Sequence, residues 1–366
     1  MGSLRSLFGG KSSALIGIDI GASAVKVLQL SRRGERYSVD ACGIEPMPAN
    51  ALRDDGQIAD PTGLSTIIKQ AVKHSGSNAH FAAVAMPSPL INDKTISLAA
   101  GLREQDMEDQ INAEFDQHIS QPRADVQLDF IRGEATTDDE SSVEVQLVAS
   151  RKEYVEARVA AVETAGLTVR VVDAETYALE GAVELLAAQL PQAERGGTTI
   201  AIADIGATRL SIPVLHDQHH VFRHDLNFGG AQLTDAIAER FGLSHDDAEA
   251  AKLAPDELPP EYATEVLPHF YDDLAQQIQL AMQYFYSGAQ TRYRGAISCL
   301  LLAGGGARLP GIAEAIGQRL QLDTQMAAPF ATTSFGGRAR AKQVREWGPT
   351  LLLAAGLALR GFDERH

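Results

Sequence analysis

Two stretches of this 366-residue chain share one pattern: IGIDIGASAVKVLQL at residues 16–30 and IADIGATRLSIPVL at residues 202–215. Each is an apolar run ending in Asp-Ile-Gly-Ala, then a turn of small residues with one hydroxyl, then a second alternating run. This arrangement around a glycine-containing turn predicts a β-hairpin. Asp19 and Asp204 occupy equivalent positions. The repeat therefore predicts two similar half-molecules that face each other.

The residues of the two turns are suited to holding phosphate. A glycine at the tip lets backbone N–H groups approach an anion closely, and Ser23 or Thr208 can add a hydroxyl donor. Lys26 can add a cation. The aspartates would repel bare phosphate, so their presence makes sense chiefly if a divalent cation lies between, usually through water for Mg²⁺. One copy could equally be an ordinary tight turn, but two copies in matching order favour a clamp for a nucleotide tail.

The rest of the chain predicts an α/β architecture with two domains. Strand-like runs at 15–20, 25–30, 81–86, 143–149, 199–205 and 297–303 alternate with helix-like segments. Apolar residues at 107, 111, 115 and 119, and at 233, 237 and 241, follow the helical period. A single core stops growing well before 366 residues. The polar stretch PQAERGG at 191–197 precedes a new strand, so we place the domain linker there.

Two further motifs lie in the second half. GGGARLP at 304–310 follows a buried-strand pattern and could admit a ligand, although a glycine turn in isolation is more often structural. A Rossmann fingerprint is excluded, because Leu309 stands where its third glycine is needed, and no GxxxxGK[ST] motif occurs. Glu249 and Lys252 are spaced i, i+3 and so share a helix face. They either serve a ligand or simply pair with each other on a solvated surface.

Composition limits the class of partner and the compartment. Lys and Arg number 32 against 48 Asp and Glu, and this net charge of -16 argues against nucleic-acid binding. Cys42 and Cys299 stand in apolar runs and fit a reducing compartment better than a disulfide framework. The start of the chain is too short in apolar residues for a signal peptide, and the apolar run at 351–359 is too short for a membrane span. We therefore expect a cytoplasmic protein.

The content and order of these motifs resemble the actin-like ATPases over residues 16–361, most of all the FtsA division proteins and the PilM family of pilus assembly proteins. The resemblance implies an α/β fold of two ribonuclease-H-like domains, with ATP and Mg²⁺ in the cleft between them. It implies that Asp19 and Asp204 serve the metal through water. The nucleotide-binding residues that it implies are Asp19, Gly21, Ala22, Ser23 and Lys26 at the first turn, Asp204, Gly206, Ala207 and Thr208 at the second, Gly230, Glu249 and Lys252 towards the ribose and adenine, and Gly304, Gly305, Gly306 and Arg308 around the base.

The PilM family is favoured over FtsA by the opening LIGIDIGASAVKVLQLSR and by the polar ending RGFDERH, which replaces a membrane-anchoring amphipathic helix. This resemblance implies a first domain at 1–190, with an inserted subdomain at roughly 87–165, and a second domain at 198–366. A groove against the inserted subdomain would accept the cytoplasmic N-terminal peptide of a PilN-like membrane protein. Other proteins of the pilus assembly platform would be partners too. The protein would lie at the inner membrane through its partners, without inserting directly.

Catalysis is expected to be slow at most. Hydrolysis needs a residue that orients the attacking water. Ala174 falls where the heat-shock chaperone ATPases carry their catalytic Glu, with Asp173 and Glu175 on either side, so no catalytic residue is assigned. The alternatives are an FtsA-like filament-forming protein and a small-molecule kinase of the same superfold. A metal site among His216, His219, His220 and His224, with Asp217, is less favoured than a solvated hairpin, and no GxSxG elbow supports a hydrolase triad.

Overall fold

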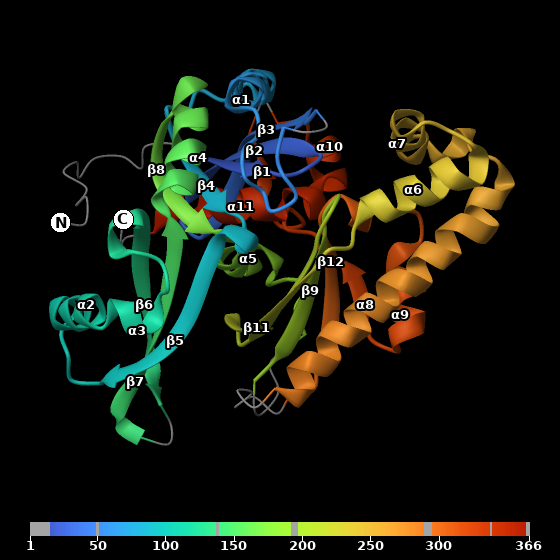
Figure 1. Ribbon diagram of the computed structural model, residues 1–366. Helices are drawn as coiled ribbons and strands as arrows, with labels where there is room; N and C mark the ends of the chain where they lie inside the picture. The colour runs from blue at the N-terminus through green and yellow to red at the C-terminus, as the bar shows by residue number, and fades with distance from the viewer. Residues whose placement is uncertain are drawn as a thin grey trace.

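The computed structural model describes residues 15–48, 51–136, 139–191, 197–288, 295–336 and 339–363. Its backbone is built on two mixed sheets of the same design (Figure 1). The first has the order β14-β3-β2-β1-β4-β8 and the second the order β11-β10-β9-β12-β13. In each, the first three strands form two antiparallel hairpins and the next two are added in parallel. The predicted duplication is therefore a duplication of topology.

The strands of the first sheet are β1 (Leu15–Ile20), β2 (Ala24–Arg33), β3 (Arg36–Pro46), β4 (Phe81–Met86), β8 (Thr168–Ala174) and β14 (Ser334–Phe335). Those of the second sheet are β9 (Thr199–Ile205), β10 (Leu210–His216), β11 (His219–Leu226), β12 (Cys299–Ala303) and β13 (Thr324–Met326). The central strands β1 and β12 are buried along their whole length. Strands covered by helices on both faces are apolar throughout rather than alternating, which is why both runs were recognisable in the sequence.

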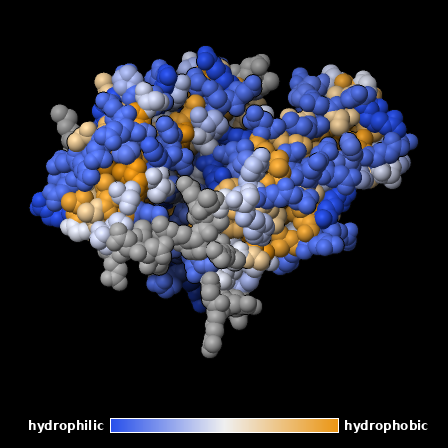
Figure 2. Space-filling view, turned by 60° about the horizontal axis from the view of Figure 1, so that its bottom comes forward, coloured by the Kyte–Doolittle hydropathy of each residue, from blue (hydrophilic) through white to orange (hydrophobic). Residues whose placement is uncertain are grey.

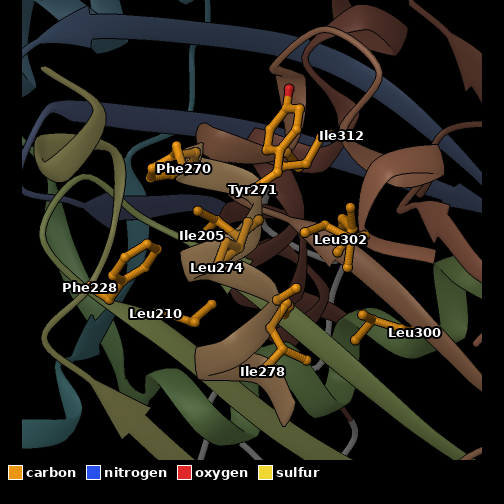
Figure 3. Packing of buried hydrophobic residues seen from close by; sticks show 14 of the residues in the cluster. Ile205, Leu210, Phe228, Phe270, Tyr271, Leu274, Ile278, Leu300, Leu302 and Ile312 are labelled. Atoms are coloured by element: carbon orange, nitrogen blue, oxygen red, sulfur yellow. The ribbon is translucent and has the colours of Figure 1, made fainter. Parts of the chain in front are cut away.

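Helices form three layers around the two sheets. The outer face of the first sheet carries α1 (Pro61–Ser75) and α4 (Lys152–Thr164), and that of the second carries α6 (Gly230–Phe241), α8 (Leu267–Ser287) and α9 (Ile312–Leu320). Between the sheets lie α5 (Glu175–Ala182) and α11 (Leu352–Leu359). Helix α7 (His245–Leu253) lies beside α6, and α10 (Ala341–Glu346) precedes α11 in the chain. Figure 3 shows Leu274 and Ile278 of α8 lying close to Ile205 and Leu210 of the second sheet.

The middle layer explains the apolar run near the C-terminus. Every residue of α11 is buried, because both sheets and α5 surround it. At Gly356 a Cβ atom would overlap the carbonyl oxygen of Ala178 in α5. A residue without a side chain is therefore required where the two helices cross.

A third, smaller sheet forms the inserted part, with the order β5-β7-β6. Its strands are β5 (Ile91–Ala99), β6 (Val126–Thr136) and β7 (Asp139–Arg151), and it is covered by α2 (Glu104–Ala113) and α3 (Phe115–His118). The helical period at residues 107–119 predicts one helix, but the helix is interrupted at Glu114. The four apolar residues are nevertheless all buried, because the break keeps them on the sheet side.

Two segments pack outside the domains in which their sequence position places them. Helix α4 falls within the expected insertion at 87–165, but Ala161 and Val162 pack into the core between the first sheet and α1. The C-terminal segment falls within the expected second domain at 198–366, but β14 pairs with β3 and α11 packs on β1. The chain thus returns to its first sheet, since that sheet offers α11 an apolar face. Of the expected linker, residues 192–196 lie outside the described part of the chain.

Further features concern the histidine-containing hairpin, the two cysteines and the surface. The histidines lie on the hairpin of β10 and β11, as expected, with Asp217 and Gln218 at the turn in the left-handed region. Cys42 and Cys299 are free thiols on β3 and β12. No helix within the described residues combines the length and apolar composition needed to span a bilayer. The face shown in Figure 2 is mostly hydrophilic, with hydrophobic residues in separate patches.

Candidate functional site

The two repeated hairpins fold into matching turns. In the first, the Gly21 N–H donates to the Ala24 carbonyl oxygen at 3.1 Å, and in the second the Gly206 N–H donates to the Arg209 carbonyl oxygen at 2.8 Å. Each turn therefore spans the same number of residues between β-strands in equivalent register. The hydroxyl-bearing residues Ser23 and Thr208 lie exposed at the tips. The sequence repeat thus places two equivalent, accessible hydroxyl groups on two glycine-containing turns.

Charged side chains from both halves share one electrostatic environment. Lys26 Nζ lies 2.8 Å from Oδ2 of Asp19 on the neighbouring strand. Burial lowers the pKa of Lys26, but the negative charges of Asp19, Asp204 and Glu175 outweigh this and leave it raised. Burial raises the pKa of Asp204 to about 6; Lys26 opposes this shift, while Asp19 and Glu175 add to it. Groups almost 190 positions apart in sequence therefore act on one another.

These carboxylates fit a hydrated divalent cation. Burial is the main cause of the raised pKa of Asp204, with the negative charges of Asp19 and Glu175 adding to it, and a bound cation would stabilise the ionised carboxylate. The described residues contain no group of three or more His, Cys, Asp or Glu side chains placed to hold a metal ion by themselves. A cation between the hairpins would thus need water or ligand oxygens to complete its coordination, which is how Mg²⁺ is usually bound.

The third glycine motif packs directly against the second hairpin. Gly304 has a φ of 81°, and its N–H donates to the Pro349 carbonyl oxygen at 2.9 Å. A Cβ atom at Gly304 would lie only 2.5 Å from Oδ1 of Asp204. Both the conformation and the close approach require glycine here. The turn then continues through Gly305 into a short 3-10 helix, Gly306–Arg308, so the motif borders the Asp204 end of β9.

Helix α6 begins against the same hairpin, and α7 packs on α6. The Gly230 N–H donates to the Gly206 carbonyl oxygen at 2.9 Å, and the next N–H in α6 donates to the Ala207 carbonyl oxygen at 2.7 Å. Lys252 Nζ donates to the Gly230 carbonyl oxygen at 3.1 Å and lies 2.5 Å from Oε2 of Glu249. Glu249 and Lys252 therefore do pair with each other. The Lys252 side chain, however, is only 11% exposed, in the seam between α6 and α7.

The segment 173–175 separates its residues into different roles. Asp173 forms an ion pair with Arg360, with Oδ2 and Nε 2.6 Å apart. Ala174 is buried at the end of β8. Glu175 begins α5, and its Oε2 lies 3.3 Å from the Ser88 backbone N and 3.5 Å from Arg209 Nη2. Glu175 is thus the residue of the three that contacts the second hairpin, and its charge also acts on Lys26 of the first.

Sequence reasoning missed the contribution of Glu175 and Arg209. Glu175 directly follows the position that was compared with a catalytic Glu, so a shift of one residue would have found it. Arg209 directly follows Thr208 in the second turn. An arginine that serves a site at this position cannot be told from a solvent-exposed arginine by sequence. Their contact joins α5 to the turn between β9 and β10, and no spacing in the sequence predicts it.

Two cavities lie beside the inserted sheet. One of about 220 Å³ is lined by the ends of the inserted strands and by a loop of the first domain, including Gln57, Leu90, Ile91, Ser150 and Tyr154. A second of about 160 Å³ lies between β5, α5 and β11. The inserted sheet thus borders concave surfaces of a kind that small ligands or peptide side chains can enter.

Comparison with known proteins agrees with this architecture. The family model described as type IV pilus assembly protein PilM matches residues 17–362. The structure is similar to one titled PilM-PilN type IV pilus biogenesis complex, with a TM-score of 0.79 and 25% identity, covering 95% of this chain and 98% of that one.

Two more distant structures share the fold. Ethanolamine utilization protein EutJ from Carboxydothermus hydrogenoformans has a TM-score of 0.54 and 14% identity over 97% of this chain and 91% of its own. A diol dehydratase-reactivating factor in nucleotide-free form has a TM-score of 0.53 and 11% identity over 96% of this chain and 100% of its own. The two duplicated mixed sheets with their helices have the actin-like fold, and the chain belongs to the PilM family of type IV pilus assembly proteins.

Proposed function

We propose that this protein binds ATP with Mg²⁺ between its two hairpins and recruits the cytoplasmic N-terminal tail of a PilN-like membrane protein to the type IV pilus assembly platform. The observation that carries the nucleotide site is the joint environment of Asp19, Lys26, Asp204 and Glu175, drawn from both halves of the chain. Membership of the PilM family supports the role in pilus assembly.

Each hairpin would hold the phosphates through its turn. Ser23 and Thr208 would donate their exposed hydroxyl groups, and Ala22 and Ala207 keep the tips free of larger side chains. Lys26 would contribute positive charge. Asp19 and Asp204 would hold the hydrated Mg²⁺, which would supply a counter-charge for the phosphate oxygens when bound.

The ribose and base would lie towards the second domain. Gly304, Gly305 and Gly306, with Arg308 at the end of the short helix, form a turn without bulky side chains beside Asp204. On the opposite side of the hairpin, the Lys252 ammonium and the Glu249 carboxylate hold α7 to α6 near Gly230. These two elements would enclose the adenosine.

The partner tail would bind at the 220 Å³ cavity between the inserted sheet and the first domain. The similar structure of a PilM-PilN complex supports a PilN-like tail as the occupant. The protein would then reach the cytoplasmic face of the inner membrane through this partner and through other platform proteins, with no direct insertion.

A scaffold role fits the cleft better than a motor role. Glu175 is held by Ser88 and Arg209. We propose slow ATP turnover at most, with nucleotide binding stabilising the closed arrangement of the two domains. Glu175 is then the best candidate to orient a water molecule, because it is the carboxylate of the 173–175 segment that contacts the second hairpin.

Calorimetric titration tests both parts. Purified protein is titrated with Mg-ATP and then with a synthetic peptide of the PilN cytoplasmic N-terminus, using a scrambled peptide as the control. Binding of both ligands supports the proposal. Binding of ATP alone would remove the pilus-tail assignment and favour an FtsA-like or kinase role, and binding of neither would overturn the proposal.

A further inference from the structure

One guanidinium beside the two hairpins has an incomplete set of partners. The Arg209 side chain is 24% exposed, and its Nη2 lies 3.5 Å from Oε2 of Glu175. Its Nη1 is buried and has no hydrogen-bond partner among the described residues. By contrast, Arg360 and Asp173 approach to 2.6 Å. A largely buried cation with one long contact pays for desolvation without full compensation. The site around Arg209 therefore lacks an acceptor.

The position of Arg209 indicates what the missing acceptor is. It directly follows Thr208 in the second turn, and its positive charge helps to stabilise the Asp204 carboxylate. The other nearby carboxylate, Asp19, is already paired with Lys26. A guanidinium offers several N–H donors in a planar fork that matches the oxygens of a phosphoryl group. A ligand can supply the acceptor, and an anionic phosphoryl group fits the guanidinium best.

We propose that Arg209 recognises the terminal phosphate of ATP by exchanging its contact with Glu175 for phosphate oxygens. This inference rests on the nucleotide site of the proposed function and adds a residue that distinguishes ATP from ADP. With ADP the terminal phosphate is absent, and Arg209 keeps its contact with Glu175. Nucleotide specificity then depends on a change of partner by one side chain.

The surroundings of Glu175 make this exchange feasible. The Ser88 backbone N–H and side-chain Oγ lie 3.3 Å and 3.5 Å from Oε2 of Glu175. These donors remain when Arg209 leaves, so the carboxylate is not left buried without a hydrogen bond. The long contact between Arg209 and Glu175 is also easier to break than a short bidentate pair.

A double-mutant cycle tests the exchange by binding alone. Mg-ATP and Mg-ADP affinities are measured by calorimetry for wild type, Arg209→Gln, Glu175→Gln and the double variant. Arg209→Gln should weaken ATP binding about 10- to 100-fold, the value of a charged hydrogen bond, and leave ADP binding nearly unchanged. Glu175→Gln should strengthen ATP binding only while Arg209 is present, because it then no longer competes with the phosphate. The two effects should therefore be non-additive.

Controls separate recognition from folding and from simple repulsion. Arg319→Gln removes an arginine that pairs with Asp272 on the outer helices of the same domain, and it should leave both affinities unchanged. Arg209→Lys should restore part of the preference for ATP over ADP. If Arg209→Gln fails to fold, Arg209→Lys is measured in its place. An equal gain from Glu175→Gln in both backgrounds would mean plain charge repulsion and overturn the exchange.

The outcomes also distinguish this inference from the function on which it rests. If wild type binds both nucleotides, and Arg209→Gln and Arg209→Lys have the same ATP-to-ADP affinity ratio as wild type, the role of Arg209 is overturned. The proposed nucleotide site would then still stand. Wild type that binds neither nucleotide would overturn both proposals. A ratio that falls in the glutamine variant and partly recovers in the lysine variant is the expected result.

Discussion

Lys26 Nζ lies 2.8 Å from Oδ2 of Asp19, its cross-strand partner on the first hairpin. The two side chains have exposed fractions of only 14% and 7%. Removing one partner from such a pair leaves an uncompensated charge, which costs more than the pair itself contributes. The pair thus fixes the positions of the Lys26 ammonium group and the Asp19 carboxylate before any ligand binds.

Asp19→Asn should weaken Mg-ATP binding at least about tenfold, because the proposed metal contact is lost and the carboxylate that positions Lys26 is removed. The amide is close in size to the carboxylate, so the fold should be retained, as circular dichroism would show. Calorimetry measures the affinity. Asp116→Asn, an exposed acid on α3, is the matched control and should bind as wild type does. Full affinity in Asp19→Asn would remove this residue from the site.

Asp204→Asn should stabilise the protein without nucleotide while weakening Mg-ATP binding. The pKa of Asp204 is raised from 3.8 to about 6, so the folded state binds a proton more tightly than the unfolded state does. Wild-type stability should therefore fall as pH rises from about 4 to about 6 and stay lower above that range. The variant lacks this loss and should be more stable by about 1–3 kcal/mol at pH 7–8.

Urea unfolding of the nucleotide-free protein at several pH values between 4 and 8 measures this difference. The two proteins should be closest in stability at the acid end of this range, because the pH has only begun to pass the ordinary pKa of 3.8 and the folded-state carboxyl is still protonated. A constant difference at all pH values would show that the carboxyl does not titrate as inferred.

Tyr154→Ala should reduce the affinity for the PilN peptide while leaving Mg-ATP binding intact. Tyr154 lines the 220 Å³ cavity, and its hydroxyl oxygen accepts a hydrogen bond of 3.3 Å from Nε2 of Gln57, which also lines it. Loss of the ring removes apolar contact area and widens the cavity. Tyr284→Ala, at an exposed position on α8, is the matched control. Unchanged peptide affinity in Tyr154→Ala would direct the search to the second cavity.

Gly356→Val should destabilise the protein by about 3 kcal/mol or more, since any side chain at this point overlaps the carbonyl oxygen of Ala178. Thermal unfolding measures the loss. Gly181→Val tests steric specificity, because a Cβ atom there meets no heavy atom within 4 Å. It should therefore cost much less, and comparable losses in the two variants would contradict the crossing of α5 and α11.

Most of the fold could be predicted from local pattern. The hairpins were predictable because an Asp-Ile-Gly-Ala turn between apolar runs has few alternative conformations, and the duplication showed that they occur twice. The expected strands at 81–86, 143–149 and 297–303 correspond to β4, β7 and β12 for the same reason. The break at Glu114 could not be predicted, because the helical period continues across it and the packing on the inserted sheet decides where the helix ends.

Many residues of the candidate site could be identified from the sequence, but their contacts with one another could not. Asp19, Asp204 and the turn at residues 304–306 were identified from glycine and aspartate spacing, and the structure brings the turn against Asp204. Glu249 and Lys252 were identified as a pair, but not their position in the seam between two helices. Glu175 and Arg209 come from different halves of the chain, and no local pattern links them.

The sequence by itself therefore determined the two hairpins, the two similar halves and the family, since short-range turn chemistry and apolar periodicity are local properties. Tertiary structure decided which charged residues act on one another, where the C-terminal helix packs and which arginine lacks an acceptor. These depend on contacts between segments distant in sequence, such as Arg209 with Glu175 and α11 with β1. Burial then sets the strength of those contacts, because charges removed from water interact far more strongly than the same charges on an exposed surface.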